Sequence, residues 1–178
     1  MRIKSILLTT AVGTGICFIL SLLFFGVRFS DVSSPPIYLL FLGFAGSLSL
    51  GLFREGQTRE VIYLNLLVYL LFVITTLRFR PVMALIFLLY DAALIFGIYI
   101  FFRKFDKEAL SQFLTGSLLL AAIAGLMYIA ASLIHGLFFI SKFQMGFLLK
   151  NFPIGFLAGL GIGLGDAINR RYWQASEE

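Results

Sequence analysis

The stretch ALIFLLYDAALIFG, residues 84–97, is almost entirely apolar, yet it contains one carboxylate, that of Asp91. It belongs to a longer apolar run, residues 82–102. That run has the length of about 20 residues that a helix needs to cross the hydrocarbon core of a bilayer. Because it is continuously apolar instead of apolar at every second residue, it is not a strand of an outer-membrane barrel. We therefore predict a transmembrane helix with an acid near its midpoint.

The composition of the whole chain agrees with this stretch. Of its 178 residues, 60% are hydrophobic and only 13% are charged, which is about half the charged fraction of soluble domains. No linker, low-complexity segment or soluble domain interrupts the apolar runs. We predict an all-α integral membrane protein that forms a single polytopic domain, residues 1–178, within the lipid bilayer.

Charged or proline-containing segments divide the chain into six apolar runs, each predicted to form one transmembrane helix of a single bundle. The first run has the basic start of a secretory signal, but it is too long for one and no A-x-A site follows, so we expect it to be retained. The fifth run is long for one span, and Gly136 or the pair Ser141 and Lys142 is expected to mark its end. The runs cover approximately residues 5–27, 37–53, 61–77, 82–102, 110–140 and 147–168.

The orientation follows from the Lys and Arg residues of the short loops. With six spans, the N-terminus, the second and fourth loops and the C-terminus share one side, which holds nine of these residues against five on the other. Loops rich in Lys and Arg remain in the cytoplasm. We predict a multi-pass protein of the plasma (inner) membrane with both termini cytoplasmic. The net charge of +5 follows from this bias and requires no nucleic-acid partner.

Asp91 and His135 are the polar residues within the spans that are most open to a functional interpretation. A carboxylate near the membrane midplane costs about 2.5–3.5 kcal/mol to insert, so Asp91 is expected to face the interior of the bundle. It either contacts a solute or a proton, or it ties helices together through a serine, a threonine or a backbone carbonyl. His135 is the only histidine, so it is either a structural residue or a contact of a ligand.

Lys150 and Asn151 lie at the outer mouth of the last predicted span. An adjacent amine and amide that open toward the outside would receive an anionic or amide-bearing solute. Lys150 alone is equally typical of a side chain that extends its charge to the interface. At the other end of this span, Asp166 lies within one turn of Arg170, and we expect the two to pair.

Small residues recur at helical spacing in three of the predicted spans. Gly155, Gly159 and Gly163 repeat every four residues in the last span, and Ala11 and Gly15 are one turn apart in the first. Gly43, Ser47 and Gly51 have the same spacing in the second span. Such faces let another helix approach to backbone contact. We predict that they pack against partner helices, in this chain or in another.

The sequence gives no indication of catalysis. It contains no H-E-x-x-H, no G-x-S-x-G, no cluster of carboxylates and no glycine-rich phosphate loop. Cys17 is the only cysteine, so neither an internal disulfide nor a thiolate metal cluster is expected. We therefore expect a protein that is not an enzyme and that has neither a cofactor nor a metal.

These features resemble the substrate-binding S-components of energy-coupling factor transporters, which have six helices in under 200 residues and no ATP-binding motif. AVGTG, residues 11–15, resembles the small-residue face with which the first helix of the family docks on a transmembrane coupling subunit. KNFPIGFLAG, residues 150–159, resembles the family's last helix, with Asn151 near its outer start. The resemblance implies a binder of a small solute such as a vitamin, captured near Lys150, Asn151 and Asp91. It also implies transport powered by partner ATPases.

One difference from the family affects the expected site, and two other classes of function stay open. The outer loops are very short, so a pocket would be shallow or formed by the helices, whereas the family commonly caps its ligand with loops. A structural subunit, similar in size and topology to the rod-shape-determining D family, would use the glycine faces to bind partner helices and Asp91 as a hydrogen-bond anchor. A lipid-modifying enzyme would need a convergent site. A polar, outward-opening cavity would favour the solute binder, and a filled bundle the structural subunit.

Overall fold

The computed structural model describes residues 2–26, 35–76, 81–105, 113–139 and 145–172. These residues form six helices and no strand. Each helix contains most of one predicted span, and α6 continues through Gly136, which therefore does not end it. Ser141 and Lys142 lie outside the described residues. The helices are α1 (Arg2–Phe25), α2 (Pro35–Arg54), α3 (Thr58–Thr76), α4 (Pro81–Lys104), α6 (Phe113–Phe139) and α7 (Met145–Tyr172).

Several of these helices have the length and composition of membrane spans. Within the described residues there are four such segments, and α2 adds a shorter apolar one, Tyr38–Arg54. Large apolar side chains such as Leu137 and Phe138 are more than three-quarters exposed, at 79% and 77%. In water such exposure would be unfavourable, and it is what a lipid-facing surface requires. The four segments are Ile3–Phe25, Leu85–Lys104, Leu114–Phe138 and Asn151–Arg171.

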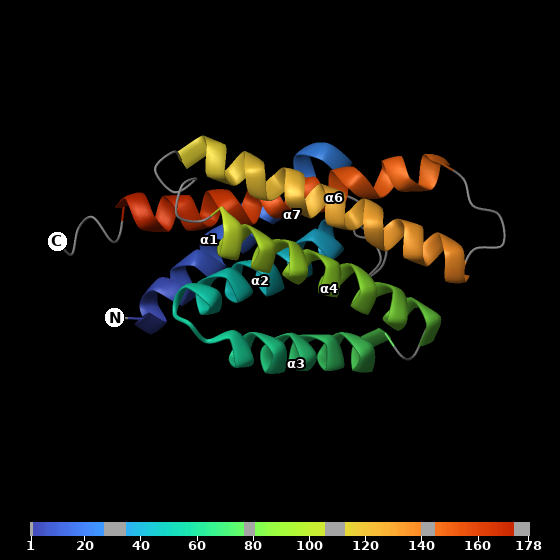
Figure 1. Ribbon diagram of the computed structural model, residues 1–178, viewed down its shortest axis with the longest axis horizontal. Coiled ribbons are helices and arrows are strands. Elements are labelled where there is room, and N and C mark those ends of the chain that lie inside the picture. The colour runs from blue at the N-terminus through green and yellow to red at the C-terminus, as the bar shows by residue number, and fades with distance from the viewer. Residues whose placement is uncertain (1, 27–34, 77–80, 106–112, 140–144, 173–178) are drawn as a thin grey trace.

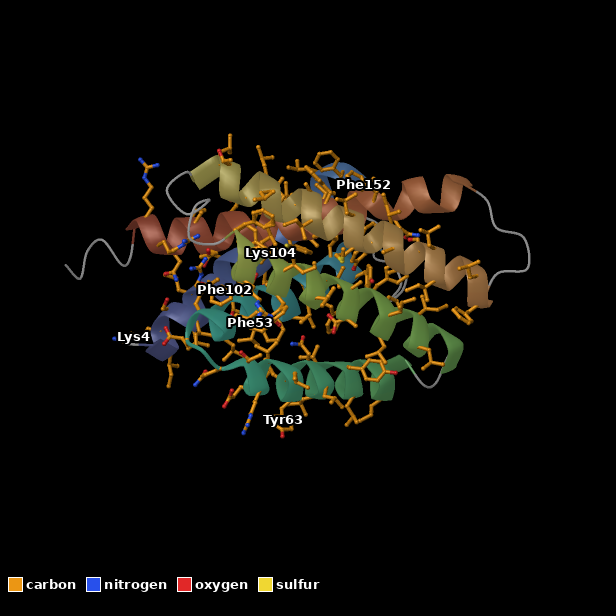
Figure 2. All side chains as sticks on the ribbon, in the orientation of Figure 1. Lys4, Phe53, Tyr63, Phe102, Lys104 and Phe152 are labelled. Atoms are coloured by element: carbon orange, nitrogen blue, oxygen red, sulfur yellow. The ribbon has the colours of Figure 1, made fainter. Side chains whose placement is uncertain are left out.

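Helix α7 is the centre of the bundle. It contacts α1, α2, α4 and α6, and its contact with α6 is the most extensive in the molecule. Helix α3, in contrast, contacts only α2 and α4 among the described helices, and it runs along one edge of the bundle (Figure 1). Its Tyr63 is 72% exposed and points away from the other helices (Figure 2).

The predicted glycine face of α7 packs against α6 of the same chain. A Cβ atom placed on Gly159 would lie 2.8 Å from the Cα of Ala121, which is backbone-to-backbone contact. Gly155 and Gly163 approach α6 equally closely, at Tyr128 and at Ser117. The spacing of these glycines thus produces an intrachain helix contact, and it permits the close α6–α7 packing that makes α7 central.

The small residues of α1 lie on two different faces of the helix. Gly13 is buried, and a Cβ atom on Gly165 of α7 would overlap its backbone, so this face of α1 closes against α7. Ala11 is exposed, and a Cβ atom on Gly15 would meet nothing within 4 Å. The face formed by Ala11 and Gly15 is therefore not used for packing among the described helices.

The first turn of α1 and the last turn of α7 lie at the same end of the bundle, which we call the termini end (Figure 1). Here Arg54, the last residue of α2, donates two hydrogen bonds of 2.8 Å to the carboxylate of Asp166. Arg170 donates a third, of 2.7 Å, so the predicted pairing of Asp166 with Arg170 is confirmed. Asn169 donates to Thr9 Oγ1 at 2.8 Å. These bonds join α1, α2 and α7.

Candidate functional site

The opposite end of the bundle, which we call the cavity end, is less tightly filled. The first turns of α2, α4 and α7 and the last turns of α6 surround a cavity of about 190 Å³, which we call the Asn151 cavity. Its polar groups are two tyrosine hydroxyls, one imidazole and one carboxamide. It is lined by Tyr38, Ile86, Phe87, Tyr90, His135, Asn151 and Ile154.

A chain of hydrogen bonds fixes the orientation of the polar groups of this cavity. The hydroxyl of Ser132 donates to the carbonyl oxygen of Tyr128 at 2.7 Å, so its oxygen accepts the hydrogen bond of 3.0 Å that joins it to the Tyr90 hydroxyl. Since the Tyr90 proton is used in that bond, its oxygen accepts at 3.4 Å from Nδ1 of His135. We therefore assign the Nδ1–H tautomer to His135.

Aromatic rings form the walls of the cavity and hold one another in place. The Tyr38 and Phe87 ring centroids are 4.9 Å apart, and those of Tyr90 and Tyr128 are 5.0 Å apart. His135 meets Tyr90 edge-on at 6.0 Å. The hydroxyls of Tyr38 and Tyr128 are joined by a hydrogen bond of 3.1 Å, so α2 and α6 are linked beside the cavity. Tilted ring pairs of this kind stabilise their geometry, which makes the site preorganised.

Asp91 lies in a second, smaller space on the other side of the Tyr38–Phe87 pair. This space of about 30 Å³, which we call the Asp91 pocket, lies among α2, α3 and α4. Tyr38 and Phe87 line both spaces and so form a common wall between them. The Asp91 pocket is lined by Tyr38, Phe41, Leu42, Ala45, Val68, Tyr69, Phe87 and Asp91.

The carboxylate of Asp91, which is half-buried, makes no hydrogen bond or ion pair with any residue that the structure describes. The helix-anchor interpretation requires a hydrogen bond to a serine, a threonine or a backbone carbonyl, and the described residues form none with this carboxylate. Asp91 and Asp166 are therefore held in very different ways, although both lie in apolar helices. Asp166 accepts three hydrogen bonds from two arginines.

Asp91 also lines a wide groove between α3 and α4, of about 410 Å³. This α3–α4 groove is almost entirely apolar, and exposed side chains such as Leu66 and Phe96 form its rim. Asn65 lines it too, and its Nδ2 donates to Ser49 Oγ at 2.8 Å and to the Val61 carbonyl at 2.7 Å. Helix α3 is thus joined to α2 by this buried amide and by the core residue Val61, which is 1% exposed.

The structure brings together only some of the residues that the sequence singled out. His135 and Asn151 line the same cavity, and Asp91 lies behind the wall that this cavity shares with the Asp91 pocket. Lys150, one residue before Asn151, is described only as a helical residue of α7. Within the described chain, no three His, Cys, Asp or Glu residues lie close enough to hold a metal ion.

Sequence reasoning missed the tyrosines of the site. Tyr90 is the neighbour of Asp91 in the sequence, but it points about 100° away from Asp91 on a helix, and that divergence directs it to the Asn151 cavity. A usable signal exists for two of the lining residues, because Tyr38 and His135 each lie near the end of a helix that the predicted alternating topology would place on the side opposite the termini.

The described fold and cavities define a class: an all-helical protein with several helices of membrane-spanning length and an aromatic, hydroxyl-lined cavity at one end. Comparison with models of protein families, with characterised proteins and with solved structures gave no match. The resemblance to S-components stays a prediction, and the function has to be argued from the site.

Proposed function

We propose that this protein is a membrane-embedded subunit that binds a small solute in the Asn151 cavity, for uptake with separate energising partner proteins. The observation that carries the proposal is the cavity itself, a hollow lined by Tyr90, His135 and Asn151 at the end of the bundle opposite the close contact between α1 and α7. With six spans and cytoplasmic termini, as the Lys and Arg distribution predicts, this end faces the outside, where an uptake protein captures its solute.

The size and chemistry of the cavity favour a small, partly aromatic solute. Its volume of about 190 Å³ is below the range of about 300–1,000 Å³ that is usual for drug-sized ligands. Ring faces stack on flat apolar groups, and the hydroxyl, imidazole and carboxamide groups supply a few directional hydrogen bonds. This combination of apolar walls with few polar groups is typical of a specific ligand site.

Catalysis is less well supported, although Tyr90 and His135 are two titratable groups within hydrogen-bond distance, at 3.4 Å. In the assigned tautomer, His135 Nδ1 donates to Tyr90, so it does not act as a base toward that hydroxyl. No serine, threonine or cysteine is among the residues that line the cavity. The arrangement therefore orients hydrogen bonds and provides no nucleophile with its base.

The face formed by Ala11 and Gly15 supports the second part of the proposal, the partner protein. It is the face that resembles the docking surface of S-components, and a helix that lay on it would meet no Cβ atom at Gly15. A structural subunit of an envelope assembly complex is the second candidate function. The same open face and the wide α3–α4 groove favour it, because both would receive partner helices.

Ligand-dependent thermal stabilisation of the purified chain tests the proposal. Wild type, His135→Leu and Asn151→Leu would be heated with a panel of vitamins, amines, amino acids and organic anions. Leu137→Ala is the matched control, since Leu137 lies two residues from His135 on α6 and is 79% exposed. We expect at least one compound to raise the melting temperature of the wild type and the control, but not of the cavity variants. Stabilisation that survives in both cavity variants would overturn the proposed site.

A further inference from the structure

We infer that the solute is an organic cation whose ammonium group binds in the Asp91 pocket. The inference rests on the proposed function and names the class of solute. It is carried by the composition of the pocket, in which the rings of Tyr38, Phe41, Tyr69 and Phe87 and the carboxylate of Asp91 surround a space of about 30 Å³.

The charge of the solute is inferred from the surroundings of Asp91 among the described residues. None of them gives its carboxylate a hydrogen bond or an ion pair, and neither Lys nor Arg lines either of the two spaces that Asp91 lines. Ionised carboxylates at membrane depth are stabilised by a cation or by hydrogen-bond donors. An anionic solute beside Asp91 would be repelled, whereas a cationic one would complete the missing pair.

The aromatic rings of the pocket also favour a cationic solute. Ring faces attract cations through their quadrupole, and several rings around one space form the cage that is typical of ammonium recognition. The volume of the pocket, about 30 Å³, exceeds the volume of about 10–15 Å³ that a cavity needs, by the same measure, to hold one water molecule. A single ammonium group, which is about as large as a water molecule, therefore fits.

The body of the solute is expected in the Asn151 cavity, on the far side of the shared wall. Tyr38 and Phe87 form this wall, and their ring centroids are only 4.9 Å apart. An amine that reaches from the Asn151 cavity into the Asp91 pocket has to separate these rings, so the pair controls access to Asp91 from the side of this cavity. Once bound, the body would contact His135 and Asn151 while the ammonium group contacts Asp91.

The test uses sets of compounds of the same shape and different charge. Primary amines such as 2-phenylethylamine, the matched alcohol 2-phenylethanol and the matched acid 3-phenylpropionate would be titrated into the purified full chain by calorimetry. We expect the amine to bind about tenfold more tightly than the alcohol, and the acid to bind least. Asp91→Asn should remove this preference, so that amine and alcohol bind alike.

Two further variants keep the result interpretable if Asp91→Asn folds poorly. Tyr69→Leu removes one ring of the cage and keeps the charge, and it should weaken amine binding severalfold while leaving the alcohol unchanged. Ile95→Trp fills the α3–α4 groove, which Asp91 also lines. It should leave amine binding intact, because the body is assigned to the Asn151 cavity.

The outcomes separate this inference from the proposed function. An alcohol or acid that binds at least as tightly as the amine, with affinity that depends on Asn151, would overturn the cation assignment and retain the solute-binding function. Loss of amine binding in Ile95→Trp but not in Asn151→Leu would overturn the assigned position of the body and place it in the groove. Failure of every amine to bind would also overturn the inference. The thermal-stability test of His135→Leu and Asn151→Leu then decides whether the Asn151 cavity binds another solute.

Discussion

Two aspartates lie in apolar helices of the bundle in opposite surroundings, Asp166 at the termini end and Asp91 near the middle of α4. Asp166 is 2% exposed and accepts hydrogen bonds from Arg54 and Arg170. Asp91 is half-buried beside empty space, and no described residue bonds to its carboxylate. A paired acid stabilises the contact between helices, whereas an unpaired acid costs stability unless something outside the chain binds to it.

The surrounding packing differs in the same way. At the termini end the backbones of α1 and α7 touch at Gly13 and Gly165, which leaves no room for a ligand. Toward the cavity end, aromatic rings and hydroxyls line spaces of about 190 Å³ and 30 Å³. We therefore assign the stability of the bundle to the termini end and the proposed solute binding to these spaces, and the substitutions below test this division.

The largest effect is expected from Gly165→Val. A side chain at this position would overlap the backbone of Gly13, and neither backbone can move without separating α1 from α7. We expect the free energy of unfolding to fall by more than about 3 kcal/mol. This would be seen as a large fall in melting temperature or in the yield of monodisperse protein. The control is Gly15→Val on the open face, which should change stability by less than about 0.5 kcal/mol. Equal effects of the two substitutions would contradict the packing described for α1.

Asp166→Asn is expected to be the next most disruptive. It leaves Arg54 and Arg170 without their shared carboxylate, although both arginines remain partly exposed, at 19% and 23%. Breaking a buried pair costs about 3–5 kcal/mol, and partial solvation of the arginines reduces this to about 2–3 kcal/mol. Thermal unfolding of the wild type and of Asp166→Asn measures this loss of stability. A melting temperature equal to that of the wild type would show that the termini end does not hold the bundle together.

A smaller effect is expected from Tyr90→Phe, which removes the hydroxyl that joins Ser132 and His135. The loss of one such hydrogen bond should lower the free energy of unfolding by about 1 kcal/mol. Because the imidazole of His135 is then no longer held in place, solute affinity should fall severalfold. Tyr63→Phe on the outer face of α3 is the matched control, and it should change neither quantity (Figure 2). Thermal stability and calorimetric affinity measure the two effects. If Tyr63→Phe reduces affinity as much as Tyr90→Phe does, the assigned site is wrong.

The order and position of the helices could be predicted from the sequence because each is a long apolar run between charged or proline-containing breaks. The expected run over residues 82–102 became α4 (Pro81–Lys104). The pair Asp166 and Arg170 was also predictable, because residues four apart meet on one helix face. Arg54, which lies 112 positions before Asp166, could not be assigned to it from local spacing.

The site was only partly predictable for a similar reason. The polarity of Asn151 and His135 marks them individually, but nothing in the sequence indicates that α2 and α4 bring Tyr38 and Tyr90 to the same cavity. The glycine spacing predicts a close helix contact without naming the other helix, which is α6. Contacts between distant parts of the chain depend on the packing of whole helices, and local patterns do not contain that information.

The most direct test of the account compares Asp91→Asn with Asp166→Asn in the same two measurements, ligand-free melting temperature and amine affinity. The account predicts that Asp91→Asn does not lower the ligand-free melting temperature, because the described residues form no bond with the carboxylate that is removed, and that it weakens amine binding about tenfold. Asp166→Asn should lower the melting temperature and leave the affinity of the folded protein unchanged. The account would be contradicted if Asp91→Asn destabilised the protein as much as Asp166→Asn does and bound amines as well as the wild type.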